Sequence, residues 1–184
     1  MTNMLVFLPF PDPGQYALNV DGSSFGNPGI SGYGGLIRDD KGNWIRGFSG
    51  HVEFTDSLHV ELLAILQGLL VALEIENIKN VSVRSDCRIA LSLITSSTPQ
   101  PHQYSQIIDQ IKELISRDWL ISFVYTQKES NQCADHMAKI GAYGINCMGV
   151  LGIFNVPPSG LYSLLKSDAE KCPYTPGHSL LSML

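Results

Sequence analysis

Four acidic residues stand at the ends of predicted elements, where carboxylates can hold metal ions. Asp21 and Asp86 each follow a short apolar run typical of a strand, while Glu61 and Asp135 lie in the first turns of predicted helices. Each has an ordinary structural alternative, because acidic residues also cap helices, favour turns and complement the helix dipole. Together they indicate a site, since open α/β sheets bind their ligands at the carboxyl ends of the strands.

A cluster of carboxylates at one sheet edge has a definite chemical consequence. Negative charges held close together repel one another unless cations neutralise them, and hard divalent ions prefer oxygen ligands. Mg²⁺ is the natural occupant of such a site. Two such ions about 4 Å apart can activate a water molecule and stabilise the leaving oxygen during in-line displacement at phosphorus. The predicted chemistry is metal-assisted hydrolysis of a phosphodiester.

The segments that must position these residues read first as strands. A buried strand at residues 16–20 leads into the first aspartate, and the glycine-rich stretch at 22–35 suits a turn that feeds a second strand at about 31–38. A hairpin loop at 39–43 then precedes a third strand that ends near His51. Three antiparallel strands therefore open the fold.

From Ser57 the apolar residues recur with the period of a helix over about twenty residues. Further elements follow: a strand at 81–85, a helix from about 89, a proline-rich break at 98–101, a helix at 107–115, a strand at 119–125 and a helix from Asn131. The order βββαβααβα predicts an α/β domain with a mixed sheet.

The composition agrees with a folded, soluble protein. The 184 residues are 44% hydrophobic and 16% charged, and the 12 basic and 17 acidic residues give a net charge of −5, which argues against tight non-specific binding to nucleic acid. The apolar stretch at residues 4–10 lacks a basic flank and is read as a packing tail, and we expect no membrane span. The four cysteines show no zinc or disulfide pattern, which favours a reducing, intracellular setting.

The motifs around the four carboxylates resemble those of the type 1 ribonuclease H domain, in the version found in plant proteins of retroelement origin. The motifs are Asn19-Val-Asp-Gly-Ser-Ser-Phe-Gly-Asn-Pro-Gly29 with Gly32-Tyr-Gly-Gly35, Val60-Glu-Leu-Leu-Ala-Ile65, Arg84-Ser-Asp-Cys87 and Asn131-Gln-Cys-Ala-Asp135. The resemblance covers residues 15–143, and the tail from Val156 to Asp168 is similar more loosely. We therefore expect an N-terminal tail at 1–14, a domain at 15–143 and a C-terminal tail at 144–184 with one short helix.

The resemblance implies a ribonuclease H-like fold with a five-stranded mixed sheet, three strands antiparallel and two parallel, flanked by helices. It also implies a monomer that cuts the RNA strand of RNA–DNA hybrids, leaving a 3′-hydroxyl and a 5′-phosphate. Its catalytic metal ligands would be Asp21, Glu61, Asp86 and Asp135, which would bind two Mg²⁺ ions, with Mn²⁺ as a substitute. Its substrate contacts would be Gly22, Ser23, Asn27, Arg88 and Asn131, with Asn27 near the 2′-hydroxyl of the RNA.

Three positions depart from the family pattern. Efficient members carry a histidine six residues before the asparagine of the last motif, where this chain has Tyr125, and a phenol is a poor base near neutral pH. Tyr125 is read as an aromatic residue packed at the end of its strand, and we predict low activity. Leu58 replaces an asparagine of bacterial members, and Arg88 replaces a glutamine, as a phosphate contact or as a solvated residue. The segment from Cys87 to Arg117 also lacks a run of basic residues.

Two other functions compete with the metal-dependent endonuclease. A non-catalytic nucleic-acid-binding or interaction remnant of a retroelement fits Tyr125 and the acidic composition. A proofreading exonuclease is disfavoured, since that chemistry expects Asp-x-Glu on the first strand, where this chain has Asp21-Gly22-Ser23.

Overall fold

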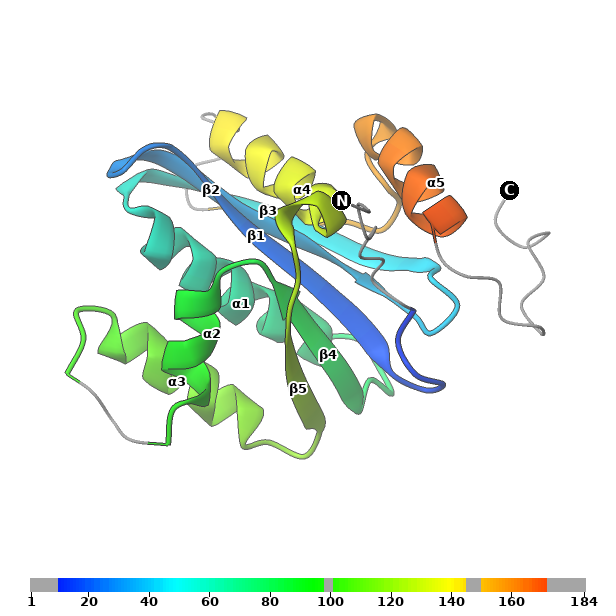
Figure 1. The fold of residues 1–184 in the computed structure, drawn as a ribbon, viewed down its shortest axis with the longest axis horizontal. Coiled ribbons are helices and arrows are strands. Elements are labelled where there is room, and N and C mark those ends of the chain that lie inside the picture. The colour runs from blue at the N-terminus through cyan, green and yellow to red at the C-terminus, as the bar shows by residue number, and fades with distance from the viewer. Residues whose placement is uncertain (1–9, 98–100, 145–149, 172–184) are drawn as a thin grey trace, which may run out of the picture.

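A six-stranded mixed sheet with helices on both faces forms the centre of the computed structural model, which describes residues 10–97, 101–144 and 150–171. The strand order is β5-β4-β1-β2-β3-β6. One face is covered by α1, α2 and α3, and the other by α4 and α5 (Figure 1). Most of the apolar stretch at 4–10, most of the proline-rich break, and Cys147 and Cys172 lie outside the described residues.

Three long antiparallel strands build the middle of the sheet, as the sequence predicts. They are β1 (Tyr16–Gly26), β2 (Gly29–Arg38) and β3 (Trp44–Thr55). The glycine-rich stretch at 22–35 was expected to form a turn that feeds a second strand at about 31–38, and it has the strand but a turn of only two residues. It forms the second half of β1 and the first half of β2, and Gly26 pairs with Gly29 around a two-residue connection.

The glycines of β2 have a packing role that local propensity does not reveal. A Cβ atom at Gly32 would lie 2.0 Å from the backbone nitrogen of Ala142, and one at Gly34 would lie 2.5 Å from the carbonyl carbon of Met137. Both contacts are with α4 (Gln132–Tyr143), so this helix packs backbone to backbone on the sheet. Glycine is therefore required in the strand for close approach of the helix.

The other face of the sheet carries the main core. Helix α1 (Ser57–Leu73) begins after the N-cap residue Asp56, and α2 (Arg88–Thr95) and α3 (Ser105–Ile115) follow β4 (Asn80–Ser85). Strand β5 (Leu120–Tyr125) pairs parallel to β4, which pairs parallel to β1. The largest fully buried side chains here are those of Leu18, Ile37, Phe48, Leu62, Ile65, Leu69 and Ile111.

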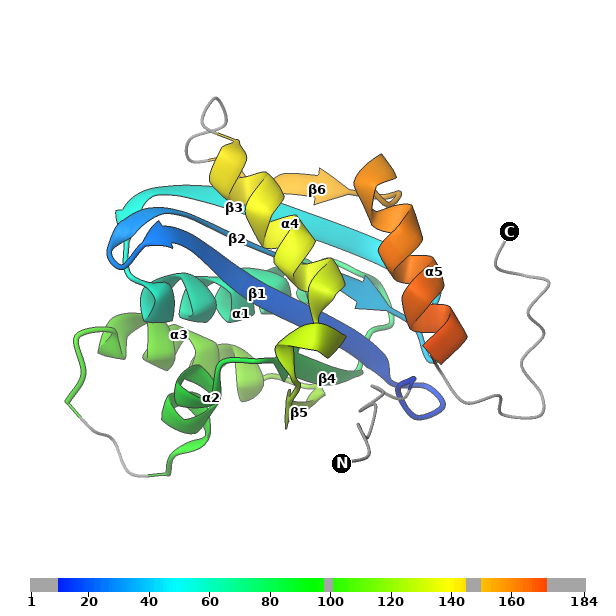
Figure 2. The ribbon, with the colours of Figure 1, turned by 45° about the horizontal axis from the view of Figure 1, so that its top comes forward.

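The described part of the expected C-terminal tail packs on the domain. Strand β6 (Gly152–Phe154) pairs with β3, so the sheet has six strands instead of the expected five. A short 3-10 turn (Ser159–Leu161) leads into α5 (Tyr162–Lys171), which is the expected short helix and lies on the same face of the sheet as α4 (Figure 2). Leu161 is fully buried with Leu36 and Met137, so packed structure continues past residue 143. Apolar burial against α4 explains why this segment belongs to the domain.

Within the described residues, no helix is both long and apolar enough to cross a membrane.

Candidate active site

Three of the four predicted carboxylates converge between β1, α1 and β4. Asp21 lies in the middle of β1, Glu61 in the second turn of α1, and Asp86 directly after the last residue of β4. One side-chain oxygen from each of these residues lies within 4.8 Å of the corresponding oxygens of the other two. The sequence prediction that these residues meet is confirmed for this group of three.

Gly22 allows α1 to approach the strand that carries Asp21. A Cβ atom at Gly22 would lie 2.6 Å from Cγ1 of Val60 and 2.9 Å from the backbone nitrogen of Glu61. The Gly22 N–H also donates a hydrogen bond of 2.9 Å to Oδ1 of Asp21. These contacts explain how Glu61 reaches Asp21, and the expected contact of Gly22 with substrate stays a prediction.

Burial and mutual repulsion favour the protonated forms of the three carboxyl groups. Burial, followed by the charges of Asp86 and Asp135, raises the pKa of Asp21 to about 7. Burial, followed by the charge of Asp21, raises the pKa of Glu61 well above its usual range. The pKa of Asp86 is also raised, chiefly by burial, although the nearby charge of Lys128 opposes the rise.

The three carboxylates fit a divalent cation on two grounds. Oε2 of Glu61 and Oδ1 of Asp86 are buried and accept no hydrogen bond from the described residues. Buried oxygens normally have a hydrogen-bond partner. These two oxygens, beside the carboxylate of Asp21, form a set of ligands that suits a hard cation. A bound cation would also reverse the effect of repulsion by favouring the ionised forms.

Asp135 lies at the margin of this group. It stands in the first turn of α4, and its charge contributes to the raised pKa values of both Asp21 and Asp86. Its carboxylate is held by Lys139, one turn further along the helix, at 2.6 Å. The expected set of four is therefore a compact group of three with a fourth carboxylate beside it, paired with a lysine.

The remaining predicted substrate contacts fall into two groups. Ser23 is half-buried on β1, and Asn27 is exposed in the β1–β2 turn, where its Oδ1 accepts a hydrogen bond of 3.1 Å from the Ser57 N–H. Arg88 is exposed at the start of α2. Ser23 and Arg88 each lie two residues from a carboxylate of the group in the sequence, and Asn27 contacts the residue that begins α1, the helix of Glu61.

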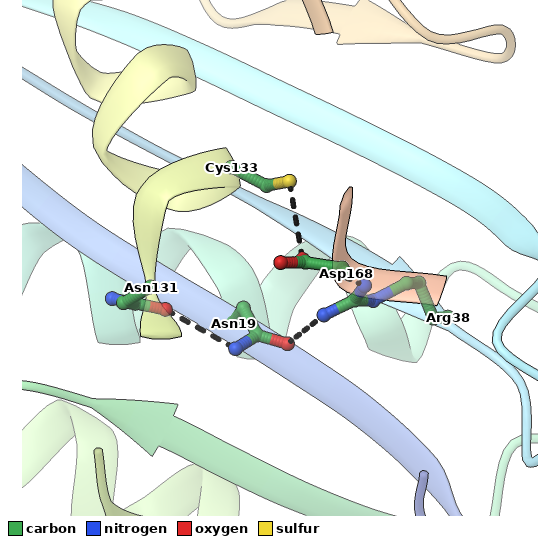
Figure 3. A network of polar contacts seen from close by, with 5 residues as sticks. All are labelled: Asn19, Arg38, Asn131, Cys133 and Asp168. Carbon is green, nitrogen blue, oxygen red and sulfur yellow. Dashed lines mark hydrogen bonds and ion pairs between the residues drawn. The ribbon is translucent and has the colours of Figure 1, made fainter. Parts of the chain in front are cut away.

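Asn131 has a different environment from the one expected of a substrate contact. It is only 2% exposed, its Nδ2 donates to the carbonyl of Val20 at 2.8 Å, and its Oδ1 accepts from Nδ2 of Asn19 at 3.1 Å (Figure 3). This side chain ties the start of α4 to β1. Sequence reasoning missed this contact between Asn131 and Asn19, and it missed Arg38, which donates to Asn19, and Asp168, which pairs with Arg38.

Similarity to known proteins agrees with this geometry. The reverse transcriptase-like family matches residues 19–141. An Arabidopsis thaliana protein named "putative ribonuclease H protein" is 28% identical over 158 residues, which are 86% of this chain and 25% of that protein. A ribonuclease H of a Sulfurovum species is 40% identical over 68 residues, 37% of this chain and 45% of that protein. The chain thus spans less than half the length of these curated relatives.

Solved structures show the same fold at low sequence identity. Ribonuclease H1 of the archaeon Halobacterium salinarum superposes with a TM-score of 0.65 at 18% identity, over 69% of this chain and 96% of that one. LC9-RNase H1 superposes with a TM-score of 0.66 at 14% identity, over 95% of this chain and 92% of that one. LC11-RNase H1 in complex with an RNA/DNA hybrid gives a TM-score of 0.59 at 23% identity, over 67% and 94%.

The family match begins two residues before Asp21 and ends six residues after Asp135, so it includes all four carboxylates. On this evidence the chain has the ribonuclease H-like fold and belongs to the reverse transcriptase-like family.

Proposed function

We propose that this chain is a metal-dependent endonuclease that hydrolyses the RNA strand of RNA–DNA hybrids. The observation that carries the proposal is the convergence of Asp21, Glu61 and Asp86, whose oxygens lie within 4.8 Å of one another. Membership of the family and the likeness to ribonucleases H support the substrate class. Mg²⁺ is the proposed ion, with Mn²⁺ as a substitute, because the donors are hard carboxylate oxygens.

The chain's own residues would hold the ions and orient the phosphate. Asp21, Glu61 and Asp86 would be ligands, and Asp135 would join them on release from Lys139. When bound, two ions would supply charge that activates a water molecule and stabilises the leaving oxygen. The hydroxyl of the water joins phosphorus as the bond to the 3′ oxygen breaks, and that oxygen takes a proton. The products are a 3′-hydroxyl and a 5′-phosphate.

Recognition of RNA is assigned to the β1–β2 turn and to the start of α2. Asn27 in the exposed turn is proposed to contact the 2′-hydroxyl region, which distinguishes RNA from DNA. Arg88 is exposed near Asp86 and is proposed to contact a phosphate. Ser23 on β1 is the third proposed contact, since it lies two residues beyond Asp21 on the same side of the strand.

The test is cleavage of an end-labelled RNA–DNA hybrid with Mg²⁺, with Mn²⁺ and with chelator. We expect slow, hybrid-specific cleavage with either ion and none with chelator. Asp86→Asn should abolish cleavage, and the matched change Asp109→Asn on the exposed face of α3 should not. Divalent ions should also raise thermal stability, by about 2.7 kcal/mol at a hundredfold excess over the dissociation constant. A melting temperature that does not move with either ion would show that the metal site is wrong.

A second candidate function is nucleic-acid binding without catalysis. Tyr125 favours it, because this residue stands where efficient relatives are expected to carry a histidine. The same assay separates the two functions, since a binding domain would retain the hybrid in a mobility-shift experiment and leave it intact with both ions.

A further inference from the structure

The carboxylate of Asp168 on α5 starts a line of polar contacts that leads to β1, the strand that carries Asp21 (Figure 3). Nη1 of Arg38 lies 3.3 Å from Oδ2 of Asp168, and Nη2 of the same guanidinium donates to Oδ1 of Asn19 at 3.2 Å. Nδ2 of Asn19 then donates to Oδ1 of Asn131 at 3.1 Å, and Nδ2 of Asn131 donates to the carbonyl of Val20 at 2.8 Å. Val20 directly precedes Asp21.

A second, shorter contact joins the same carboxylate to α4. Sγ of Cys133 lies 3.4 Å from Oδ2 of Asp168, and Cys133 is in the first turn of α4. The last turns of α5 are thus attached to the start of α4 by two routes. One passes directly through the cysteine, and the other passes through Arg38 and the two asparagines.

Arg38 determines how the amide groups of Asn19 and Asn131 are oriented. An asparagine amide offers an acceptor on one side and donors on the other, so fixing one side fixes the other. Because the guanidinium can only donate, it takes Oδ1 of Asn19 and turns Nδ2 toward Asn131. Asn131 must then present its oxygen to Asn19 and its nitrogen to Val20. Both asparagines are 2% exposed, so water is a poor substitute for these partners.

Arg38 depends on Asp168 for its place in this line. The Arg38 side chain is 11% exposed and that of Asp168 is 19% exposed. A charge with so little access to water needs a close counter-charge, and loss of one partner leaves the other charge buried. Asp168 therefore controls the position of the guanidinium that orients both amides.

The end of the line meets the carboxylate site through the backbone. The carbonyl of Asn131 accepts the hydrogen bond of the Asp135 N–H at 3.0 Å, which opens α4. The Asn131 side chain donates to the carbonyl of Val20, the residue before Asp21 on β1. The position of Asn131 thus sets how Asp135 stands relative to the group of three carboxylates.

We infer that Asp168, in the C-terminal helix, is a positioning residue for the metal centre, acting through Arg38 and Asn131 on the start of α4. The inference deepens the proposed function and rests on it, because the positioned group is the carboxylate site. It gives the described C-terminal segment a role in the chemistry, although none of its residues belongs to the carboxylate group.

The test compares Asp168→Asn with the unmodified full chain in Mn²⁺ binding without substrate, followed by electron paramagnetic resonance. We expect the half-saturating Mn²⁺ concentration to rise about tenfold, at the low end of the effect of residues that orient metal ligands, because Asp168 acts through others. Amide exchange should quicken at the start of α4 and not across the sheet. The control is Glu170→Gln on the same helix, where Glu170 is exposed and paired with Lys166, and it should change neither readout.

A second variant separates positioning from general stability. In Arg38→Met with Asp168→Leu both charges are removed, which commonly preserves stability, but Asn19 loses its donor. We expect a smaller loss of melting temperature than in Asp168→Asn, because no charge is left buried and only the Asn19 acceptor loses its donor, together with Mn²⁺ binding that is still weakened. Normal Mn²⁺ binding by this double variant, or by Asp168→Asn, would overturn the inference.

The two proposals can fail separately. An unmodified chain that binds Mn²⁺ and cuts no hybrid would refute the endonuclease, while the binding comparison would still decide the role of Asp168. An unmodified chain that cuts hybrid, together with variants that bind Mn²⁺ normally, would refute the role of Asp168 alone. An unmodified chain that binds no Mn²⁺ would overturn both.

Discussion

The guanidinium carbon of Arg88 lies 3.6 Å from the centre of the Tyr125 ring, so the first residue of α2 is stacked on the last residue of β5. The contact occurs beside the carboxylate site, because Tyr125 pairs with Ser85, the residue before Asp86. Tyr125 is 39% exposed, so its ring packs on Arg88 while part of it remains open to solvent. A cation over an aromatic face is an attractive contact. It joins a proposed phosphate contact to the residue that replaces the expected histidine.

The first prediction concerns Tyr125→His. A histidine with an ordinary pKa near 6.5 can exchange protons at neutral pH, and positioned acid–base groups contribute roughly 10²–10⁴-fold to a rate. We expect a gain of about tenfold in hybrid cleavage, set low because the histidine would assist bound metal ions. Tyr125→Phe is the control, since it retains the aromatic face and should leave the rate unchanged. Equal single-turnover and steady-state rates for Tyr125→His and the unmodified chain would exclude this position from proton transfer.

The second prediction concerns the dependence of hybrid binding on salt. Arg88, Lys112 and Arg117 are the basic residues between 87 and 117, and Nζ of Lys112 donates to the Ser96 carbonyl at 3.1 Å. We expect a slope corresponding to about three phosphate contacts or fewer, and a decrease of about one in that slope for Arg88→Ala. Arg117→Ala, at the far end of α3, should not alter it. A slope that corresponds to six or more phosphate contacts would show that another surface of the protein binds the hybrid through basic residues.

The third prediction is a loss of stability with rising pH in metal-free protein. The pKa of Asp21 is raised from 3.8 to about 7, so between these pH values the folded state binds more protons than the unfolded state. The contribution of Asp21 to the free energy of unfolding should therefore fall across this window by up to about 4 kcal/mol and level off above it. Asp21→Asn should be more stable than the unmodified protein at pH 8 in urea denaturation. A flat pH profile for the unmodified protein would contradict the packing of these carboxylates.

The fourth prediction concerns Gly22→Ala. The added methyl group would press on Val60 and on the backbone of Glu61, and overpacking of this kind costs about 1–3 kcal/mol. We expect this loss of stability together with weakened metal binding, because α1 must move Glu61 away from Asp21. Gly152→Ala in β6 is the control, since its Cβ atom would meet nothing closer than 3.4 Å. Metal titration monitored by thermal unfolding measures both effects, and unchanged metal affinity would show that Glu61 tolerates the shift.

The spacing of apolar residues predicted the helices and strands that short stretches of the chain determine. The periodicity of the elements that carry Asp21, Glu61 and Asp86 is plain in the sequence, although β1 continues past Asp21 to Gly26 instead of ending there. Helix α4 was likewise expected from Asn131, and it begins at Gln132. These predictions succeeded because a short stretch of chain determines each element.

Tertiary contacts determined what the sequence could not indicate. The second half of β1 and the start of β2 were misread, because glycine has no propensity for strands and its role there comes from the helix above it. The pairing of Arg38 with Asp168 spans 130 residues and leaves no periodic signal. The sixth strand has three residues, too few for alternation to be seen.

The burial of Leu161 against Leu36 and Met137 determines where this domain can be cut without loss of its packing. A module cut after residue 143 would leave Leu36 and Met137 without their neighbour and would separate Arg38 from its counter-ion. A truncation or fusion at that point should therefore lower the free energy of unfolding of the domain. The smallest unit that retains these contacts extends through α5.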